Sequence, residues 1–421
     1  KSTKYWCVTM ARLNDVAWQR ILDAETLARI EREGFVEFSA KQLKEKGGRE
    51  PRLLAKHDFS ASRPEIFQEH NLSIFPIRRD GYVVGNFDVY EPFPETVTPL
   101  KTLPVPQGVE SLDFDNLSSE TLVLNAAVIA GVLQDFLGVD KLHATVAGRM
   151  STGTVSMRLR GEELVVDRAQ MEIDGGFEAP ECLVLIECKN HISPDFNIRQ
   201  LYLPFRRFSQ QLGKEVVPVY LVYSNGIFHL YRYRFSDAED FRSIQLEAAA
   251  RYMLGESELN TESVKAVLRR SSPREAEIPF PQADSFARVV SLWEMLPLPK
   301  AEIPERFGFS HRQADYYLNA GRYLGLMRIE DELVEGIELA DTRDGRNLQL
   351  IEALASRPVF HEMVAAVAEK QRMLSKEEAV AIMEAADLNI SGSTLPRRAQ
   401  TVVAWSQWVA ELFAPQQLSL L

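Results

Sequence analysis

Residues 170–190, "QMEIDGGFEAPECLVLIECKN", decide how the centre of this chain folds. Two stretches with strand character flank residues 179–182, whose proline at the second position is typical of a tight turn. Side chains two residues apart lie on the same face of a strand. An antiparallel pair closed by this turn therefore places Asp174 opposite Glu187, with Lys189 on the same face as Glu187.

Two opposed carboxylates repel each other, so they favour a shared proton or a divalent cation between them. Oxygen ligands from Asp174, Glu187 and the backbone carbonyl of Cys188 suit Mg²⁺, with Mn²⁺ as a substitute. Lys189 can then orient or deprotonate an attacking water and stabilise charge on a phosphate. This is the chemistry of metal-assisted phosphodiester hydrolysis. The alternative is an ordinary cross-strand salt bridge, for which the same register puts Glu172 opposite Lys189.

The bulk composition is that of a soluble globular protein. The chain has 421 residues, of which 45% are hydrophobic and 26% charged, and no apolar run is long enough to span a bilayer. Its three cysteines, Cys7, Cys182 and Cys188, have no metal-ligand spacing, and we expect a cytoplasmic protein without disulfides or membrane association. The net charge of -12 means that only local basic patches can attract nucleic acid.

Residues 1–105 are expected to form an α+β domain that takes part in DNA recognition. Its end, "EPFPETVTPLKTLPVPQG", is rich in proline and is interpreted as a linker. Residues 79–81 are typical of a hairpin turn between two short strands. A basic segment in this domain is either a solvated loop or a phosphate-contacting surface. Its candidate DNA contacts are Arg49, Arg52 and Lys56.

Residues 106–275 are expected to form an α/β catalytic core, a mixed β-sheet flanked by helices. Ser118 or Ser119 can cap the first helix of this core. The expected elements are strands at 143–161, 163–174 and 182–189, a helix within 196–213 that contains a proline, and two strands joined at residues 225–226.

Residues 276–343 have the pattern of a winged helix-turn-helix. A short helix leads to Ser310, which with Gln313 makes a capping box at the start of a second helix. A short strand pair follows that helix, as a wing would. The side chains expected to face outward toward a DNA groove are Arg312, Gln313, Tyr316, Asn319 and Arg322.

Residues 344–421 repeat this pattern as a second, mainly helical helix-turn-helix module. A capping box at Ser375 starts one helix, and the next helix opens at Pro396 after the turn "LNISGS". Arg397 and Arg398 are then placed to contact bases or phosphates. We interpret Trp405 and Trp408 as core or interface residues. The alternative for both modules is contact with another protein.

The stretches "EIDGGFE" and "LVLIECKN" resemble the motif of the PD-(D/E)XK nuclease superfamily, with Asp174, Glu187 and Lys189 as its two acids and its lysine. Ile173 stands where the superfamily usually has proline. "LVLIECKNHISPDFNIRQLYLPFRRF" and "GFSHRQADYYLNAGRYLGL" are similar to segments of a group of type II restriction endonucleases. The N-terminal domain also resembles the leading domain of that group, so the resemblance covers most of the chain.

The resemblance implies further residues of the catalytic site. Glu120 matches an acid that often completes the metal site, although an acid in the first turn of a helix is also favoured by the helix dipole. Gln200 matches a glutamine found one helix after the lysine, and its alternative is an ordinary surface glutamine. Arg199, Arg206 and Arg207 lie near the same helix and could meet the DNA backbone.

Together these observations predict a Mg²⁺-dependent, sequence-specific endonuclease of double-stranded DNA, a type II restriction enzyme that acts in host defence. A homodimer is expected because cutting two strands normally needs two active sites. A cognate DNA methyltransferase would be its genetic partner. The alternatives are a DNA-binding regulator with an inactive nuclease-like module, and a repair or mobile-element nuclease that recognises DNA structure.

Overall fold

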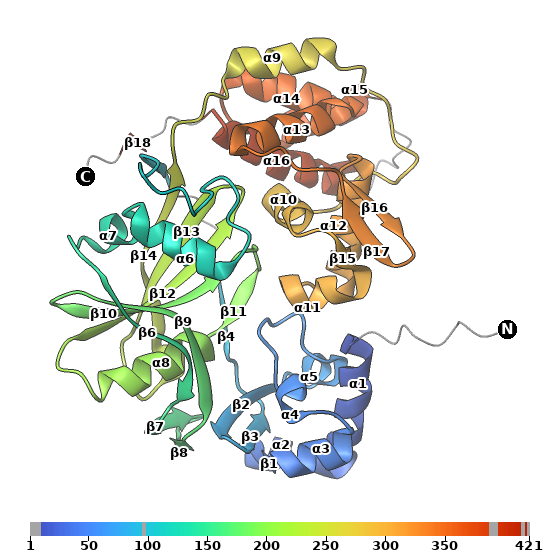
Figure 1. Ribbon diagram of the computed structural model, residues 1–421. Coiled ribbons are helices and arrows are strands. Elements are labelled where there is room, and N and C mark those ends of the chain that lie inside the picture. Colours follow the sequence, from blue (N-terminus) through green and yellow to red (C-terminus); the bar gives the residue numbers. More distant parts are fainter. Residues whose placement is uncertain (1–9, 95–97, 387–394, 414–416, 419–421) are drawn as a thin grey trace.

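The computed structural model describes residues 10–94, 98–386, 395–413 and 417–418, in three regions that follow one another along the chain (Figure 1). The whole is a mixed α/β architecture. In Figure 1 the green central sheet lies at the left, the orange-to-red helical module at the upper right, and the blue N-terminal region at the lower right. Within these described residues, no helix has both the length and the apolar character needed to cross a membrane.

The N-terminal region packs helices against three antiparallel strands. Capping fixes its helices locally; for example, Ser39 and Gln42 form a capping box at the start of α3. The predicted hairpin at residues 79–81 is confirmed, because β2 and β3 pair across it. The elements are α1 (Met10–Ile21), α2 (Ala24–Glu33), β1 (Phe35–Ser39), α3 (Ala40–Gly47), α4 (Pro51–Leu54), α5 (Glu65–Glu69), β2 (Ser73–Arg78) and β3 (Gly81–Gly85).

The central region is built on a mixed sheet whose strands run in the order β18-β5-β14-β13-β12-β10-β9-β6. Its elements are β4 (Tyr90–Pro92), β5 (Leu100–Leu103), α6 (Glu120–Ile129), α7 (Val132–Leu137), β6 (His143–Ser151), β7 (Thr154–Leu159), β8 (Glu162–Asp167), β9 (Gln170–Glu178), β10 (Cys182–Lys189), β11 (Asp195–Asn197), α8 (Arg199–Ser209), β12 (Glu215–Ser224), β13 (Ile227–Phe235), the short helix η1 (Phe241–Ser243) and β14 (Ile244–Leu254). The predicted mixed sheet flanked by helices is therefore present.

Two of the strand candidates are each divided between two sheets. The stretch 143–161 turns at Gly153, where φ is +65°, and the stretch 163–174 turns at Arg168, where φ is +52°. In each stretch one half, β6 or β9, joins the central sheet, and the other half, β7 or β8, joins an N-terminal sheet of order β1-β3-β2-β8-β7. Gly153 and Arg168 lie opposite each other, since the Arg168 N–H donates to the Gly153 carbonyl (2.8 Å), and the paired strands keep one register on either side of them. The left-handed backbone at these two positions therefore bends the strand pair from one sheet into the other, which strand alternation alone does not reveal.

The predicted linker of residues 91–108 contains strands, so that interpretation is wrong. β4 pairs with β11, and β5 lies in the central sheet next to β14. The prolines stand at strand ends, since Pro99 precedes β5 and Pro104 follows it. Proline lacks a backbone N–H and is tolerated at strand ends. The high proline content of this segment therefore reflects short strands and not a linker.

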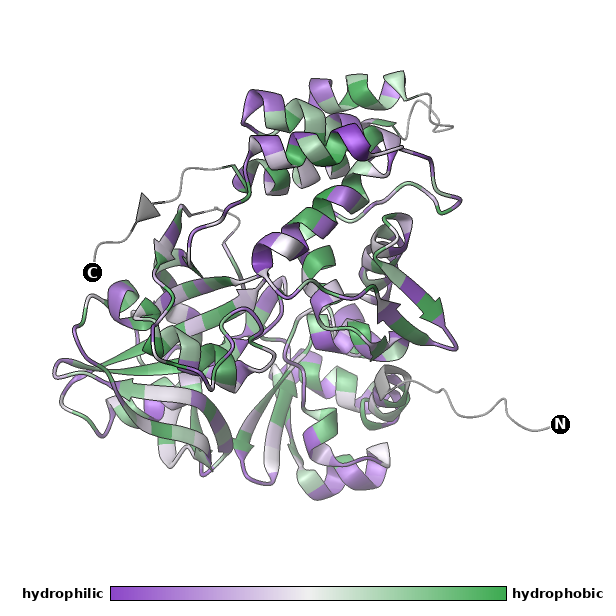
Figure 2. Cartoon of the chain, turned by 45° about the horizontal axis from the view of Figure 1, so that its top comes forward, coloured by the Kyte–Doolittle hydropathy of each residue, from purple (hydrophilic) through white to green (hydrophobic). Residues whose placement is uncertain are grey.

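Helices cover both faces of the central sheet. α6 and α7 pack with one apolar cluster that includes Val184 and Ile186, and α8 packs with another that includes Leu183 and Leu185. These four neighbouring positions of β10 alternate between the two faces and are all buried. Much of the central sheet is accordingly green in Figure 2. β10 is therefore buried on both sides up to the point where its charged residues begin.

The C-terminal module is mainly helical and contains a small sheet of order β15-β17-β16. Its elements are α9 (Thr261–Arg270), α10 (Phe286–Glu294), β15 (Leu298–Pro299), the short helix η2 (Lys300–Glu302), α11 (Ile303–Phe307), α12 (His311–Tyr323), β16 (Met327–Glu330), β17 (Leu333–Gly336), α13 (Arg343–Ala355), α14 (Pro358–Lys370), α15 (Lys376–Ala385) and α16 (Leu395–Glu411). β18 (Gln417–Leu418) pairs with β5 of the central sheet.

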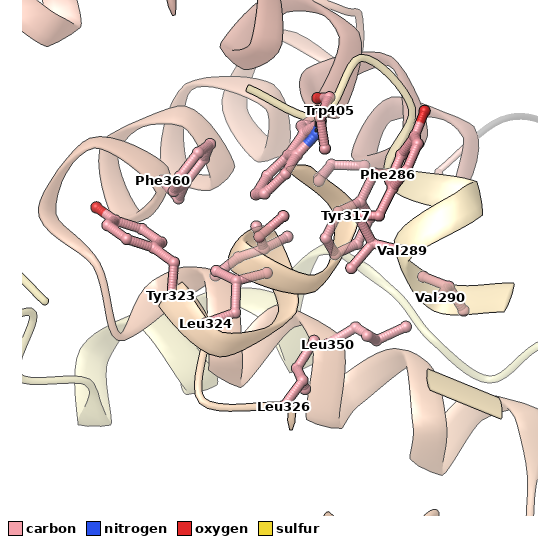
Figure 3. Close-up of a cluster of buried hydrophobic side chains, with 14 of the residues drawn as sticks. Phe286, Val289, Val290, Tyr317, Tyr323, Leu324, Leu326, Leu350, Phe360 and Trp405 are labelled. Atoms are coloured by element: carbon pink, nitrogen blue, oxygen red, sulfur yellow. Dashed lines mark hydrogen bonds between the residues drawn. The ribbon is translucent and has the colours of Figure 1, made fainter. Parts of the chain in front are cut away.

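The predicted modules 276–343 and 344–421 share one hydrophobic core. Side chains from α10, α12, α14 and α16 meet in a single cluster (Figure 3). Trp405 of α16 lies 4.5 Å from Phe360 and 4.8 Å from Phe286 between ring centroids. The two patterns therefore belong to one packed body, whose boundary does not fall at residue 343.

Candidate functional site

The hairpin of β9 and β10 has the register that the sequence predicts. The paired positions run from Leu183–Glu178 to Ile186–Gly175, and the Ala179 N–H donates to the Cys182 carbonyl across the turn (2.9 Å). Beyond this ladder, the Cys188 N–H donates to Oδ2 of Asp174 (2.8 Å) instead of to the backbone. The carboxylate of Asp174 thus accepts the hydrogen bond that a backbone carbonyl of β9 would accept if the ladder continued.

The ammonium group of Lys189 is the centre of the site. Its Nζ lies 2.7 Å from Glu187 Oε1 and 2.9 Å from the carbonyl oxygen of Cys188. It also lies 3.5 Å from Glu120 Oε1 and 3.7 Å from Asp174 Oδ2. The structure therefore brings together all the residues predicted as metal ligands, and each of them contacts this one cation.

Burial sets the charges of this cluster. It raises the pKa of Glu187 to about 8, against the opposing effect of the Lys189 ammonium. Burial also disfavours the ammonium of Lys189, but Glu187 and the other acids outweigh it and raise the pKa of Lys189 well above its ordinary value. Burial raises the pKa of Glu120, and Lys189 opposes that rise. The cluster therefore keeps a positive charge at its centre at neutral pH.

Gln200 and Glu120 reach the site from two helices. Gln200 lies in the first turn of α8 and donates its side-chain N–H to Oε1 of Glu187, the same oxygen that contacts Lys189. Glu120 is the first residue of α6, where Ser119 caps the helix by accepting from the Leu122 N–H (3.3 Å). The alternative reading of Gln200 as an ordinary surface glutamine does not hold in this structure.

Glu172 lies outside the cluster. The predicted register puts it opposite Lys189, but the backbone ladder of β9 and β10 ends at Gly175 and Ile186. Glu172 instead forms an exposed ion pair with Arg149 of β6, at 3.3 Å. Glu172 therefore does not pair with Lys189, although Lys189 does form a cross-strand ion pair with Asp174 at 3.7 Å, as the salt-bridge alternative expects.

The donor set of the cluster fits a hard cation. Three carboxylates and a backbone carbonyl are all oxygen donors, the kind that Mg²⁺ takes in proteins. In the part of the chain that the structure describes, however, no three His, Cys, Asp or Glu side chains are grouped so as to hold a metal ion by themselves. The Lys189 ammonium separates the acids, so a metal ion could enter only if the ammonium withdrew.

The predicted DNA contacts near α8 differ in exposure. Arg206 is buried and donates to the Ser156 carbonyl (2.8 Å), so its predicted contact with DNA is wrong. Arg199 is half-buried in an ion pair with Asp58 of the N-terminal region, at 3.4 Å. Arg207 is also half-buried, with its guanidinium over the ring of Phe208.

The start of α12 and the hairpin after it are as the sequence predicts, but only one of the five side chains expected to face outward is exposed. Ser310 and Gln313 form the capping box, and β16 and β17 form the hairpin that follows the helix. Arg312 is exposed and donates to the hydroxyl of Tyr316 (2.6 Å), over whose ring it also lies. The other predicted outward residues of α12 are half-buried: Gln313, Tyr316, Asn319 and Arg322.

The start of α16 is only partly as predicted. Arg397 is exposed, as predicted. Arg398 is half-buried, and its guanidinium donates to the Phe280 carbonyl within the C-terminal module. The capping box at Ser375 is present. The predicted turn "LNISGS" lies outside the described residues.

In the N-terminal region, the basic segment is partly helical. Arg52 lies in α4 and is exposed, as is Lys56 just after it, while Arg49 is half-buried. Lys56 lies 4.0 Å from Asp58, the partner of Arg199. The basic segment is therefore close in sequence to a residue that contacts the start of α8.

Sequence reasoning missed two residues beside the cluster. Asp58 belongs to another region of the chain, and no local pattern connects it with α8. Tyr220 is fully buried on β12, where its Cα pairs with that of Glu187. Among the described residues, nothing accepts from or donates to its hydroxyl. A parallel pairing of β10 with β12, had it been predicted, would have placed Tyr220 here.

Comparisons with known proteins divide the chain in a similar way. It is similar to three domains of unknown function: DUF6996 over residues 15–84, DUF6997 over residues 85–253 and DUF7226 over residues 288–414. A search of curated proteins gives no match. A search of solved structures gives none either. The second domain contains the whole Lys189 cluster, and the third spans both predicted C-terminal patterns.

Proposed function

We propose that this protein is a Mg²⁺-dependent endonuclease that cuts double-stranded DNA at a specific sequence, as a type II restriction endonuclease does. The convergence of Glu120, Asp174, Glu187 and the Cys188 carbonyl on the Lys189 ammonium carries this proposal. The proposed fold is a PD-(D/E)XK-like core with a C-terminal winged helix.

In this proposal the chain's own residues divide the work. Asp174, Glu187 and the Cys188 carbonyl would hold Mg²⁺ or Mn²⁺, with Glu120 as a further acid. Bound Mg²⁺ supplies a Lewis acid and lowers the pKa of a coordinated water. Lys189 stabilises negative charge on the phosphate. The hydrogen bond that the Cys188 N–H donates to Asp174 would hold Cys188, whose carbonyl is the proposed ligand, in place.

DNA recognition is assigned to α12 and to the N-terminal basic segment. A helix that follows a short helix and a turn can enter a major groove. Arg312 offers an exposed cation on α12. The tip of the hairpin that follows is instead acidic and exposed, with Glu330, Asp331 and Glu332. Because phosphates repel acids, the proposed contact uses the helix and keeps this tip away from the DNA.

The biological setting is part of the same proposal. Cutting both strands calls for two active sites, so the working form is a homodimer. A restriction enzyme acts in host defence, with a cognate DNA methyltransferase as its genetic partner.

The decisive experiment is digestion of a fully sequenced plasmid with Mg²⁺ or Mn²⁺. Wild-type protein should give discrete fragments, while Lys189→Ala and Asp174→Asn should give none. Glu172→Gln is the matched control, because Glu172 is an acid on the same strand that pairs with Arg149 outside the cluster. Mn²⁺ should also raise the melting temperature of wild type and of Glu172→Gln, but not of Asp174→Asn. Intact plasmid under all conditions, modified DNA included, would contradict the proposal.

The second candidate function is a DNA-binding regulator whose nuclease-like module is inactive. It is favoured by the ammonium of Lys189, which contacts all of the proposed ligand groups. A regulator would bind DNA without cutting it, and Mn²⁺ would leave its melting temperature unchanged. Fragments that follow DNA structure instead of sequence would indicate a repair or mobile-element nuclease.

A further inference from the structure

The segment from Asn190 to Arg199, called here the connecting segment, joins two residues of the catalytic cluster. Lys189 precedes it and Gln200 follows it, and both contact the same oxygen, Oε1 of Glu187. Any shift of this segment therefore moves the ammonium and the amide that hold Glu187. What fixes the connecting segment consequently also fixes the cluster.

The N-terminal region holds the connecting segment through residues 57–60, called here the clasp. Asp195 accepts from the Ser60 N–H (3.0 Å) and from its hydroxyl. The side-chain amide of Asn197 donates to the carbonyl of His57 (2.9 Å). The pairing of β11 with β4 reinforces these contacts.

Asp58, the acidic residue of the clasp, contacts the end of the connecting segment. It pairs with Arg199 at 3.4 Å, and both side chains are about one-fifth exposed. Arg199 is next to Gln200 in α8, so the ion pair ties the clasp to the helix turn that carries the amide. Asp195 is 8% exposed and Asn197 is 1% exposed. Bonds of this kind are expensive to break because their polar groups would stay buried without partners.

The clasp directly follows the basic segment that is proposed to meet DNA. Arg52 and Lys56 are exposed, and Lys56 is adjacent to the first residue of the clasp. On its other side, the connecting segment contacts the C-terminal module, since the Ile192 N–H donates to the hydroxyl of Ser291 (2.9 Å). The connecting segment is therefore held by both regions to which DNA recognition is assigned.

We propose that the clasp couples DNA contact by the N-terminal region to the position of Lys189 and Gln200, so that DNA gripped at Arg52 and Lys56 is the DNA that is cut. This inference rests on the proposed endonuclease function and adds a regulatory path to the same site. Asp58 and Ser60 act as positioning residues, because they reach the cluster only through the connecting segment.

The test uses two full-length variants of similar side-chain size. Asp58→Asn removes the ion pairs of Asp58 with Arg199 and with Lys56, and Ser60→Ala removes the hydroxyl that donates to Asp195. The control is Glu411→Gln, which removes a different contact between regions, the 2.7 Å ion pair of Arg251 with Glu411. Hydrogen–deuterium exchange of peptides covering residues 186–201 is measured with and without a DNA duplex, in Ca²⁺ to prevent cutting. Cleavage rate and DNA affinity are measured on the same preparations.

Asp58→Asn and Ser60→Ala should speed exchange in residues 190–199 about 10-fold relative to wild type, because the segment loses its anchor. Duplex DNA should protect this segment in wild type and in Glu411→Gln but not in the two clasp variants. Cleavage should fall about 10- to 100-fold in the clasp variants with DNA affinity within about 2-fold, since a small misplacement of catalytic groups suffices for such a loss.

The coupling would be overturned if both clasp variants showed the same hydrogen exchange and the same protection by DNA as Glu411→Gln. It would also be overturned if wild type cut DNA and both clasp variants cut it at the same rate. If wild type binds DNA but cuts nothing, the endonuclease proposal fails separately, and protection of residues 190–199 by DNA still decides whether the clasp transmits contact. Absence of any DNA binding overturns both.

Discussion

The Lys189 cluster, which is partly buried, and the fully buried core of the C-terminal module are held together by opposite means. In the cluster, a single ammonium is shared by acids that would otherwise repel one another. In the module, rings from four helices pack directly, as Figure 3 shows for Phe286, Tyr317, Phe360 and Trp405. The cluster therefore depends on each partner being present, whereas the core depends on filled volume.

The largest loss of stability is expected from the core. Trp405→Ala should lower the free energy of unfolding by about 4 kcal/mol, because it empties the space between α10 and α14 and removes the indole N–H bond to the Ala283 carbonyl. Urea unfolding measures this change. Trp408→Ala is the matched control, because Trp408 is on the same helix but only partly buried, and its cost should be smaller.

The same variant tests whether the module has one core. Hydrogen exchange should show α12 and α16 losing protection together in Trp405→Ala. Loss confined to α16 would restore the division at residue 343 that the sequence suggested.

For the cluster, removal of one charge should cost about 3 kcal/mol in unfolding free energy. Lys189→Met keeps the length of the side chain but leaves the buried Glu187 without its ammonium. The double variant Glu187→Gln/Lys189→Met should recover part of that loss at alkaline pH, above the pKa of about 8 of Glu187, where the single variant would leave an uncompensated carboxylate. Equal losses in the single and double variants would mean that the cluster is held by packing, like the C-terminal core.

This contrast also explains what could be predicted from sequence. The register of β9 and β10 follows from a four-residue turn and from alternation, both of which are local. Glu120 and Gln200 are far from the hairpin in sequence, so they were found only through the resemblance to a nuclease family. Asp58 had neither signal. Contacts between separate regions depend on how those regions pack against each other. Sequence periodicity does not predict that packing.

The error at Arg206 has a different cause. Tyr202 and Leu203 are four and three residues before it in α8, so helical periodicity puts all three on one buried face. Arg207 lies about 100° further round the helix and is half-buried. Reading both arginines as DNA contacts ignored this difference, although the sequence contained it. The shared C-terminal core, by contrast, needed three-dimensional information.

A smaller effect is expected for Gln200, which orients an acid without supplying charge. In the proposed reaction, Gln200→Ala should reduce the cleavage rate about 10-fold, because Glu187 loses a hydrogen bond while keeping Lys189. Single-turnover cleavage measures the rate. Gln210→Ala is the control, since Gln210 is an exposed glutamine at the end of the same helix. A loss as large as that of Asp174→Asn would place Gln200 among the essential groups.

The smallest effect is expected at the exposed face of α12, where neighbouring side chains pair locally and water screens their charges. Arg312→Ala should weaken DNA binding about 3-fold and reduce the slope of log affinity against log salt by about 0.9, as loss of one phosphate contact does. Fluorescence anisotropy at several salt concentrations measures both quantities. Stability should hardly change, because the bond of Arg312 to Tyr316 is exposed.

Arg328→Ala is the control for Arg312, because Arg328 is an exposed arginine of the same module that already pairs with Glu335, at 2.6 Å, in the acidic hairpin. Its removal should leave the salt slope unchanged if α12 and not the hairpin faces the DNA. The opposite result, a lower slope for Arg328→Ala and none for Arg312→Ala, would move the DNA contact to the hairpin. It would also mean that the exposed charge of Arg312 on α12 does not contribute to DNA binding. The exposed surface to compare with the Lys189 cluster would then be the hairpin of β16 and β17.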